Sequence, residues 1–255
     1  MQAAMGQLGR WFVLLVLSLL ALQLYFVARI AAMRFVDPLS TTFERSEAWR
    51  LLTEKGRIDW SQQWVDQSRI SASLKRAVIA SEDAAFVDHG GVDWDAMEKA
   101  WERNQRAQAA ATRREEQAAR RPAAATGKAA RPPKVVGGST ITQQLAKNLF
   151  LSGERTVVRK AQELMLTYTL EALLPKQRVL EIYLNHVEWG EGLFGAQAAA
   201  RHYFRVDAAR LGDWPAARLA VMLPAPKRYA QRMGSGYLSE RAGTIVARMG
   251  DVELP

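Results

Sequence analysis

The sequence of 255 residues contains no cysteine. This absence excludes disulfide bonds, a thiol nucleophile and thiolate metal sites, although it leaves the cellular compartment open. The only histidines are His89, His186 and His202, and their scattered positions lack the ligand spacing of a zinc site. The alternating apolar and polar residues of half-buried strands are also scarce. These absences favour a mostly α-helical protein that uses neither thiol nor histidine–metal chemistry.

Positive charge is abundant, but one segment carries most of it. The formal net charge is +9, and residues 103–134 supply +7 of it through seven arginines, two lysines and two glutamates. The same segment contains eleven alanines and little that could be buried, so it reads as a low-complexity insertion. It is either a tolerated surface insertion or a tether attracted to anionic lipid. The charge therefore does not indicate nucleic acid as a partner.

The longest apolar run lies near the amino terminus. Trp11–Ala28 is 18 residues without a charge, bracketed by Arg10 and Arg29. As a helix this run spans about 27 Å, close to the thickness of a hydrocarbon core. A cleaved signal peptide is the alternative, but no clean small-residue cleavage site follows. We predict an uncleaved membrane anchor, and the balanced flanking charges do not set its orientation.

The rest of the chain reads mainly as helices. Apolar spacing indicates helices over Ser139–Leu151, Thr156–Leu174 and Lys176–His186, and Asp213 with Pro215 reads as the cap and first turn of another. The predicted organisation is an N-terminal segment at 1–34 with its anchor at about 11–31, a membrane-proximal connector at 35–69, and one domain at 70–250 that contains the insertion at 103–134.

Three segments concentrate polar side chains beside apolar ones. Glu82 and Asp83 end the apolar run that starts at Ala77, which indicates a helix end or a site, because unpaired carboxylates are costly to bury. The stretch GGSTITQQLAKNLF, residues 137–150, combines two glycines with a capping box of Thr140 and Gln143. Its helix N-terminus suits an anion.

The third segment places charges on one helix face. Glu163 stands four residues after Arg159 and three after Lys160. In an isolated helix this pattern is most often a surface ion pair worth a few tenths of a kcal/mol.

Together, in this order, EDAAFVDHGGVD, GGSTITQQLAKNLF, RKAQE and KQRVLEIYLNHVEWGEGLFG resemble the motifs of the family 51 peptidoglycan glycosyltransferases. The resemblance covers about residues 70–229 and the anchor. It implies a lysozyme-like, mostly helical glycosyltransferase domain behind one transmembrane helix. The implied reaction polymerises lipid II into β-1,4-linked glycan strands, with inversion and release of undecaprenyl diphosphate.

The resemblance also assigns site residues. Glu82 is implied as the general base, and Glu163 as a second catalytic glutamate that orients cations or a metal near the diphosphate. A base is needed because a sugar hydroxyl is a poor nucleophile, and cations can replace a strong general acid when diphosphate leaves. The implied substrate-binding residues are Ser139, Thr140, Gln143, Gln144, Lys147, Arg155, Arg159 and Lys160, and the implied supporting residues are Asp83, Phe86, His89 and Asn185.

No obligatory cofactor is expected, although Mg²⁺ or Mn²⁺ could bind at the diphosphate with Glu163 as the candidate ligand. The expected partners are lipid II, the lipid-linked glycan strand, the membrane and other cell-wall synthesis and division proteins, and no nucleic acid. The expected location is the bacterial inner membrane, single-pass, with the catalytic domain on the periplasmic face.

Other functions remain as alternatives. A bifunctional penicillin-binding protein is excluded, because Ser-x-x-Lys and Lys-Thr-Gly are both absent. A lysozyme-like lytic enzyme would also use a glutamate on a helical fold, but it has no need of a cationic diphosphate site. An inactive membrane scaffold of the wall-synthesis complex is disfavoured because both glutamates are present. The insertion at 103–134 departs from the family pattern and leaves the conformation there open.

Overall fold

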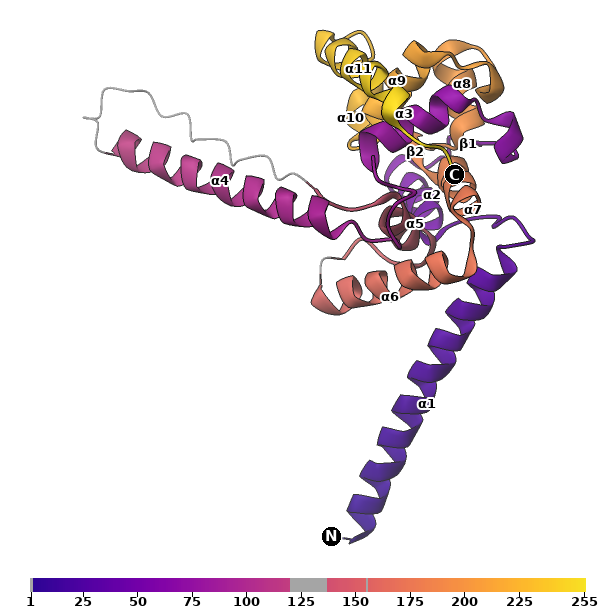
Figure 1. Ribbon diagram of the computed structural model, residues 1–255. Coiled ribbons are helices and arrows are strands. Elements are labelled where there is room, and N and C mark those ends of the chain that lie inside the picture. The colour runs from indigo at the N-terminus through magenta and orange to yellow at the C-terminus, as the bar shows by residue number, and fades with distance from the viewer. Residues whose placement is uncertain (1, 120–136, 155) are drawn as a thin grey trace.

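The computed structural model describes residues 2–119, 137–154 and 156–255. The prediction of a mostly helical protein behind one apolar N-terminal helix is confirmed. Figure 1 shows a cluster of helices from which α1 and α4 project in different directions. The elements in chain order are α1 (Gln2–Ala32), α2 (Thr42–Lys55), β1 (Ser61–Gln62), η1 (Gln67–Arg69), α3 (Ala72–Glu82), α4 (Trp94–Ala119), α5 (Ile141–Phe150), α6 (Val157–Leu173), α7 (Lys176–His186), β2 (Glu188–Gly190), β3 (Leu193–Phe194), α8 (Ala196–Phe204), η2 (Ala208–Arg210), α9 (Asp213–Met222), α10 (Pro226–Ala230), α11 (Gly236–Arg248) and η3 (Met249–Asp251).

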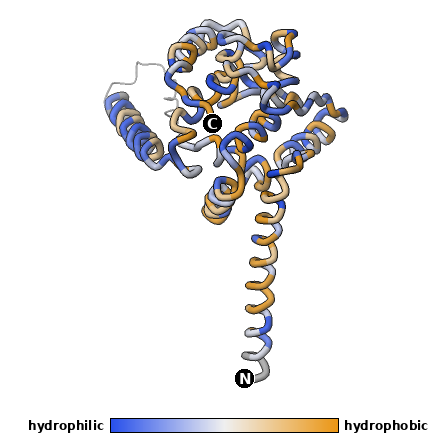
Figure 2. The backbone as a smooth tube through the Cα atoms, turned by 45° about the vertical axis from the view of Figure 1, so that its right-hand side comes forward, coloured by the Kyte–Doolittle hydropathy of each residue, from blue (hydrophilic) through white to orange (hydrophobic). Residues whose placement is uncertain are grey.

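The helix α1 divides into two parts. Gly6–Ala32 is long and apolar enough to cross a membrane, and Figure 2 shows it as mostly hydrophobic. Every side chain from residue 6 to residue 22 is exposed. From Gln23 onward the helix contacts the domain. Gln23 and Gln162 of α6 exchange two amide hydrogen bonds, of 3.1 and 3.2 Å, and Phe26 packs edge-on against Phe150. The anchor is therefore docked on α6 as well as tethered to the domain.

The core lies between α3, α9 and α11 and extends beneath α5, α7 and α8. Trp189 and Phe194 are fully buried there, and the Trp189 indole donates to the Leu219 carbonyl at 3.1 Å. A small sheet of order β1-β3-β2 closes one side, with β1 parallel and β2 antiparallel to β3. Trp60, just before β1, stacks on Phe194, so part of the 35–69 segment packs into the domain.

Helix ends follow the local sequence with one exception. Thr140 and Gln143 form the predicted capping box of α5, and Lys176–His186 is helical over its full predicted length. The predicted cap at Asp213 is wrong: Asp213 is the first residue of α9, and Gly212 occupies the cap position. The Asp213 carboxylate accepts a 2.6 Å hydrogen bond from Ser73 Oγ instead, because the α3–α9 packing places that hydroxyl beside it.

The first half of the basic segment continues α4, which is helical to Ala119 and strongly hydrophilic along its length (Figure 2). Residues 120–134 of the predicted insertion lie outside the described residues. At the base of α4 the chain passes close to Gly138, where an added Cβ would lie 3.1 Å from Met97 Cα. Glycine at 138 is therefore explained by close packing against α4.

Candidate active site

An open cleft of about 520 Å³ lies along α5. In Figure 1, α5 lies between α6 below it and α2 and β2 above it, and the contacts of α5 with α6 and α2 agree with this order. The cleft is lined from α2 by Phe43 and Ser46, from α5 and its flanks by Ser139, Gln143, Gln144, Lys147, Asn148, Leu151, Ser152, Gly153 and Glu154, from α6 by Arg159, Lys160 and Glu163, and elsewhere by Val187, Glu188, Leu223 and Pro226.

Glu82 is the last residue of α3 and lies beside this cleft, partly exposed. Gln144, which lines the cleft, donates to Glu82 Oε2 at 2.9 Å and accepts from the Tyr183 hydroxyl at 2.9 Å. Burial raises the pKa of Glu82, and the charge of Asp83 acts in the same direction, while hydrogen bonds from Gln144 and Ser81 oppose both. A carboxylate with a raised pKa, held by a directed amide, is suited to accept a proton.

Asp83 points the other way, into the protein, although it is adjacent in sequence. Its Oδ2 accepts the backbone N–H of Ile141 at 2.9 Å, at the start of α5, and its Oδ1 accepts from His89 Nε2 at 2.8 Å. The His89 Nδ1 accepts the Gly91 N–H at 3.1 Å, so the ring hydrogen resides on Nε2. Asp83 and His89 therefore link the end of α3 to the start of α5, which fixes Glu82 relative to Gln144.

Gly91 helps to hold the same junction between the end of α3 and the start of α5. Gly91 has a φ of +90°, and a Cβ there would lie 2.7 Å from Glu171 Cγ. Its carbonyl accepts the Thr140 hydroxyl at 2.6 Å. Thr140 and Gln143 are both buried, and of the two only Gln143 lines the cleft. Thr140 thus contributes through the helix cap and the Gly91 contact.

The cations predicted from the sequence gather at the α6 end of the cleft. Glu163, which is 3% exposed, accepts from Arg159 at 2.6 Å and from Lys160. These pairs are not the exposed surface pairs that an isolated helix would have. Lys147 lines the same cleft, and within the described residues its ammonium forms no hydrogen bond or ion pair.

The electrostatics of this group favour an anion. Burial lowers the pKa of Lys147; the Glu163 charge opposes this, and Arg159 and Lys160 add to the lowering. Within this group, three cations against one carboxylate leave a formal charge of +2, and Glu154 and Glu188 are the other charged residues of the lining. A diphosphate placed here would satisfy Lys147 and relieve the repulsion among the cations. Arg155, also predicted to bind substrate, lies outside the described residues.

The remaining predicted supports lie away from the cleft. Asn185 is fully buried and exchanges hydrogen bonds of 2.9 Å with the backbone of Val65. Phe86 is buried beneath Lys176, whose ammonium lies 4.5 Å from the ring centroid. Lys176 also donates to the His89 carbonyl at 2.7 Å. These residues hold the framework and do not line the cleft.

Two charged residues that line the cleft were not predicted from the sequence: the exposed Glu154, and Glu188 in β2. Glu188 is 6% exposed and lies among apolar neighbours in sequence, where the only available signal was a carboxylate within a buried stretch. Two segments from α2 and the α9–α10 turn were missed as well, because apolar residues such as Phe43 and Leu223 carry no chemical signature.

Comparisons with known proteins show the family of the chain. The model of the Transglycosylase family matches residues 51–114 and 118–250. The chain belongs to the Transglycosylase family. Among curated relatives, the biosynthetic peptidoglycan transglycosylase of Burkholderia thailandensis is 50% identical over 236 residues, covering 92% of this chain and 83% of the relative. The proteins of the same name from Burkholderia lata and Burkholderia orbicola are each 48% identical, covering 92% of this chain and 86% of the relative.

Replacing Asp83 by alanine is expected to destabilise the transglycosylase by about 2–4 kcal/mol, because it leaves the Ile141 N–H and His89 without their acceptor. Chemical denaturation followed by circular dichroism measures the loss. The matched control is Asp88→Ala, since Asp88 is exposed on the same turn. Equal stability of the two variants would show that the Asp83 junction does not hold α3 to α5.

Proposed function

We propose that this transglycosylase polymerises lipid II into peptidoglycan glycan strands. The donor is the growing strand on undecaprenyl diphosphate, and the acceptor is a second lipid II. The observation that carries the proposal is that Gln144, which lines the same cleft as the cations Lys147, Arg159 and Lys160, donates a hydrogen bond to the partly buried carboxylate of Glu82. The names of the relatives support peptidoglycan as the polymer.

The proposed step is a single displacement. The 4-hydroxyl oxygen of the acceptor attacks C1 of the donor sugar while its proton passes to Glu82. The C1–oxygen bond to the diphosphate breaks, and the diphosphate keeps the electron pair. Lys147, Arg159 and Lys160 stabilise that developing charge, so no strong acid is needed. Attack opposite the leaving group inverts the anomeric carbon and gives a β-1,4 bond.

Glu163 acts in this proposal by orienting cations. Both of its carboxylate oxygens are engaged, by Arg159 and by Lys160. This donor set does not suit a divalent ion, and within the described ranges no group of three or more acidic, histidine or cysteine residues could hold one. We therefore derive no step through Mg²⁺ or Mn²⁺.

The proposed location is the bacterial inner membrane, with the domain on the periplasmic face where the glycan is built. The apolar helix α1 fits a single-pass anchor. The contact of α1 with α6 through Gln23 and Gln162 supports a position of the cationic end of the cleft near the membrane, where a lipid-linked diphosphate would reside. Wall-synthesis and division proteins are proposed as partners on the family resemblance alone.

Incubating the full-length protein in detergent with fluorescent lipid II tests the proposal. We expect glycan polymers on gel electrophoresis, with a rate that changes less than about threefold when EDTA replaces magnesium. A parallel incubation with preformed glycan strands tests the lytic alternative, which predicts shortening of those strands. Shortened strands without polymer would contradict synthesis, and inactivity in both reactions would favour the scaffold.

A further inference from the structure

Glu188 is a buried carboxylate that the reaction proposed above does not use. Its side chain lines the cleft, yet within the described residues neither of its oxygens receives a hydrogen bond. Oε1 is fully buried, and the nearest cation, Lys227 Nζ, lies 3.6 Å away. Buried carboxylates are normally held by several hydrogen-bond donors, so one at a ligand cleft that has only a 3.6 Å ion pair with Lys227 needs a reason.

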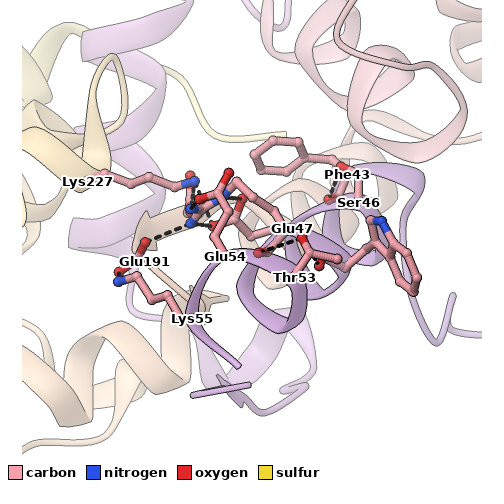
Figure 3. A network of polar contacts seen from close by, with 11 residues as sticks. Phe43, Ser46, Glu47, Thr53, Glu54, Lys55, Glu191 and Lys227 are labelled. Carbon is pink, nitrogen blue, oxygen red and sulfur yellow. Dashed lines mark hydrogen bonds and ion pairs between the residues drawn. The ribbon is translucent and has the colours of Figure 1, made fainter. Parts of the chain in front are cut away.

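The neighbouring ion network explains why Glu188 is left without donors. Lys227 is engaged at 2.6 Å by Glu47, which also accepts two hydrogen bonds from Arg50. Arg50 extends the network to Glu54 and Glu191 on the surface (Figure 3). The network therefore satisfies Glu47 at close range, while Glu188, which lines the cleft, has only the 3.6 Å ion pair with Lys227.

We propose that Glu188 positions the donor glycan by binding a neutral hydrogen-bond donor, a hydroxyl or an amide N–H of an amino sugar. The inference rests on the proposed function and adds a residue to it. The bound hydroxyl or N–H would give Glu188 a hydrogen-bond donor, which the protein itself does not provide. Burial raises the pKa of Glu188 to about 7, with Lys227 acting against the rise and the charge of Glu47 adding to it.

The position of Glu188 in the cleft favours the sugar, rather than the diphosphate, as the part of the donor that it binds. The cations Lys147, Arg159 and Lys160 come from α5 and α6, whereas Glu188 comes from β2, which packs against α10 on the other side of α5 (Figure 1). A carboxylate would repel the diphosphate, and the ammonium of Lys227 beside it makes a second cation unfavourable. The neutral polar groups of a glycan that extends from the diphosphate, away from α6, fit this place.

The test compares Glu188→Gln and Glu188→Leu with the wild type. We expect the KM for lipid II to rise about tenfold in Glu188→Leu and less in Glu188→Gln, which keeps one acceptor oxygen, with kcat changed less than about threefold. Without substrate, both variants should melt about 2–4 °C higher, because an unpartnered buried acid is removed. A purely structural residue would show the opposite sign in melting temperature.

The control is Glu54→Gln, the same charge change in the same network but on an exposed side chain outside the cleft. Its KM and kcat should equal those of the wild type. Binding of fluorescent lipid II, measured by anisotropy without turnover, separates the two proposals: a wild type that binds but does not polymerise contradicts the proposed function alone. Unchanged KM and Kd in both Glu188 variants, or a fall in melting temperature in both, would overturn the role of Glu188.

Discussion

Replacing Glu82 by glutamine is expected to lower the polymerisation rate by about a thousandfold, because the acceptor hydroxyl then loses its base. The amide has nearly the volume of the carboxylate and can still contact Gln144, so the fold should persist. Burial raises the pKa of Glu82 above its ordinary value of 4.5, so the wild-type rate should fall as pH drops through that raised pKa. Single-turnover polymerisation of fluorescent lipid II measures the change in rate.

Asp88→Asn provides the control for Glu82→Gln. It makes the same carboxylate-to-amide change in the same segment, on an exposed side chain that does not line the cleft. Its rate should match the wild type. A Glu82→Gln enzyme that polymerises within about tenfold of the wild type would remove Glu82 as the base and leave proton transfer to another group.

Replacing Lys147 by methionine is expected to lower kcat by about a hundredfold. The loss of one cation aimed at the leaving diphosphate corresponds to the loss of one preorganised donor in other enzymes. Burial already lowers the pKa of Lys147, so its charge is maintained at a cost that the bound diphosphate offsets. The variant should therefore be at least as stable as the wild type in thermal melting without substrate, while its turnover falls.

The matched control for Lys147→Met is Lys99→Met on α4, where the lysine is exposed and outside the cleft. We expect wild-type turnover from it at both low and high salt. If Lys147→Met raised KM with kcat unchanged, Lys147 would bind the diphosphate equally before and during reaction, contrary to the proposed step.

The sequence predicted those parts of the site that depend on short-range chemistry. Thr140 and Gln143 are three residues apart, and the capping box they form needs nothing else. Arg159, Lys160 and Glu163 lie within about one turn, so their pairing could be predicted, although the burial of Glu163 could not. Burial depends on α5 packing over α6, which is a property of the whole fold.

Long-range placement could not be read in the same way. That Asp83 turns inward to meet Ile141 while Glu82 turns toward Gln144 depends on where α5 lies relative to α3. Glu188 was not predicted because its proposed role depends on Arg50 and Lys227, which bind Glu47 at close range. These two residues come from α2 and α10, far from Glu188 in the sequence. The Asp213 cap was mispredicted for the same kind of reason, since Ser73 on α3 takes its carboxylate.

The two parts of α1 differ in how freely their amino-acid sequence can change. Residues 6–22 expose every side chain, so their sequence is constrained only by the need to remain apolar, and that stretch is available to lipid or to another membrane helix. From Gln23 onward α1 contacts α6, because the Gln23 and Gln162 amides exchange two hydrogen bonds. The helix α6 also carries Arg159 and Lys160, two of the cations that line the cleft. Replacing the part of α1 before residue 23 with a foreign transmembrane segment would leave the contact with α6 intact. A replacement that included Gln23 would remove its hydrogen bonds with Gln162.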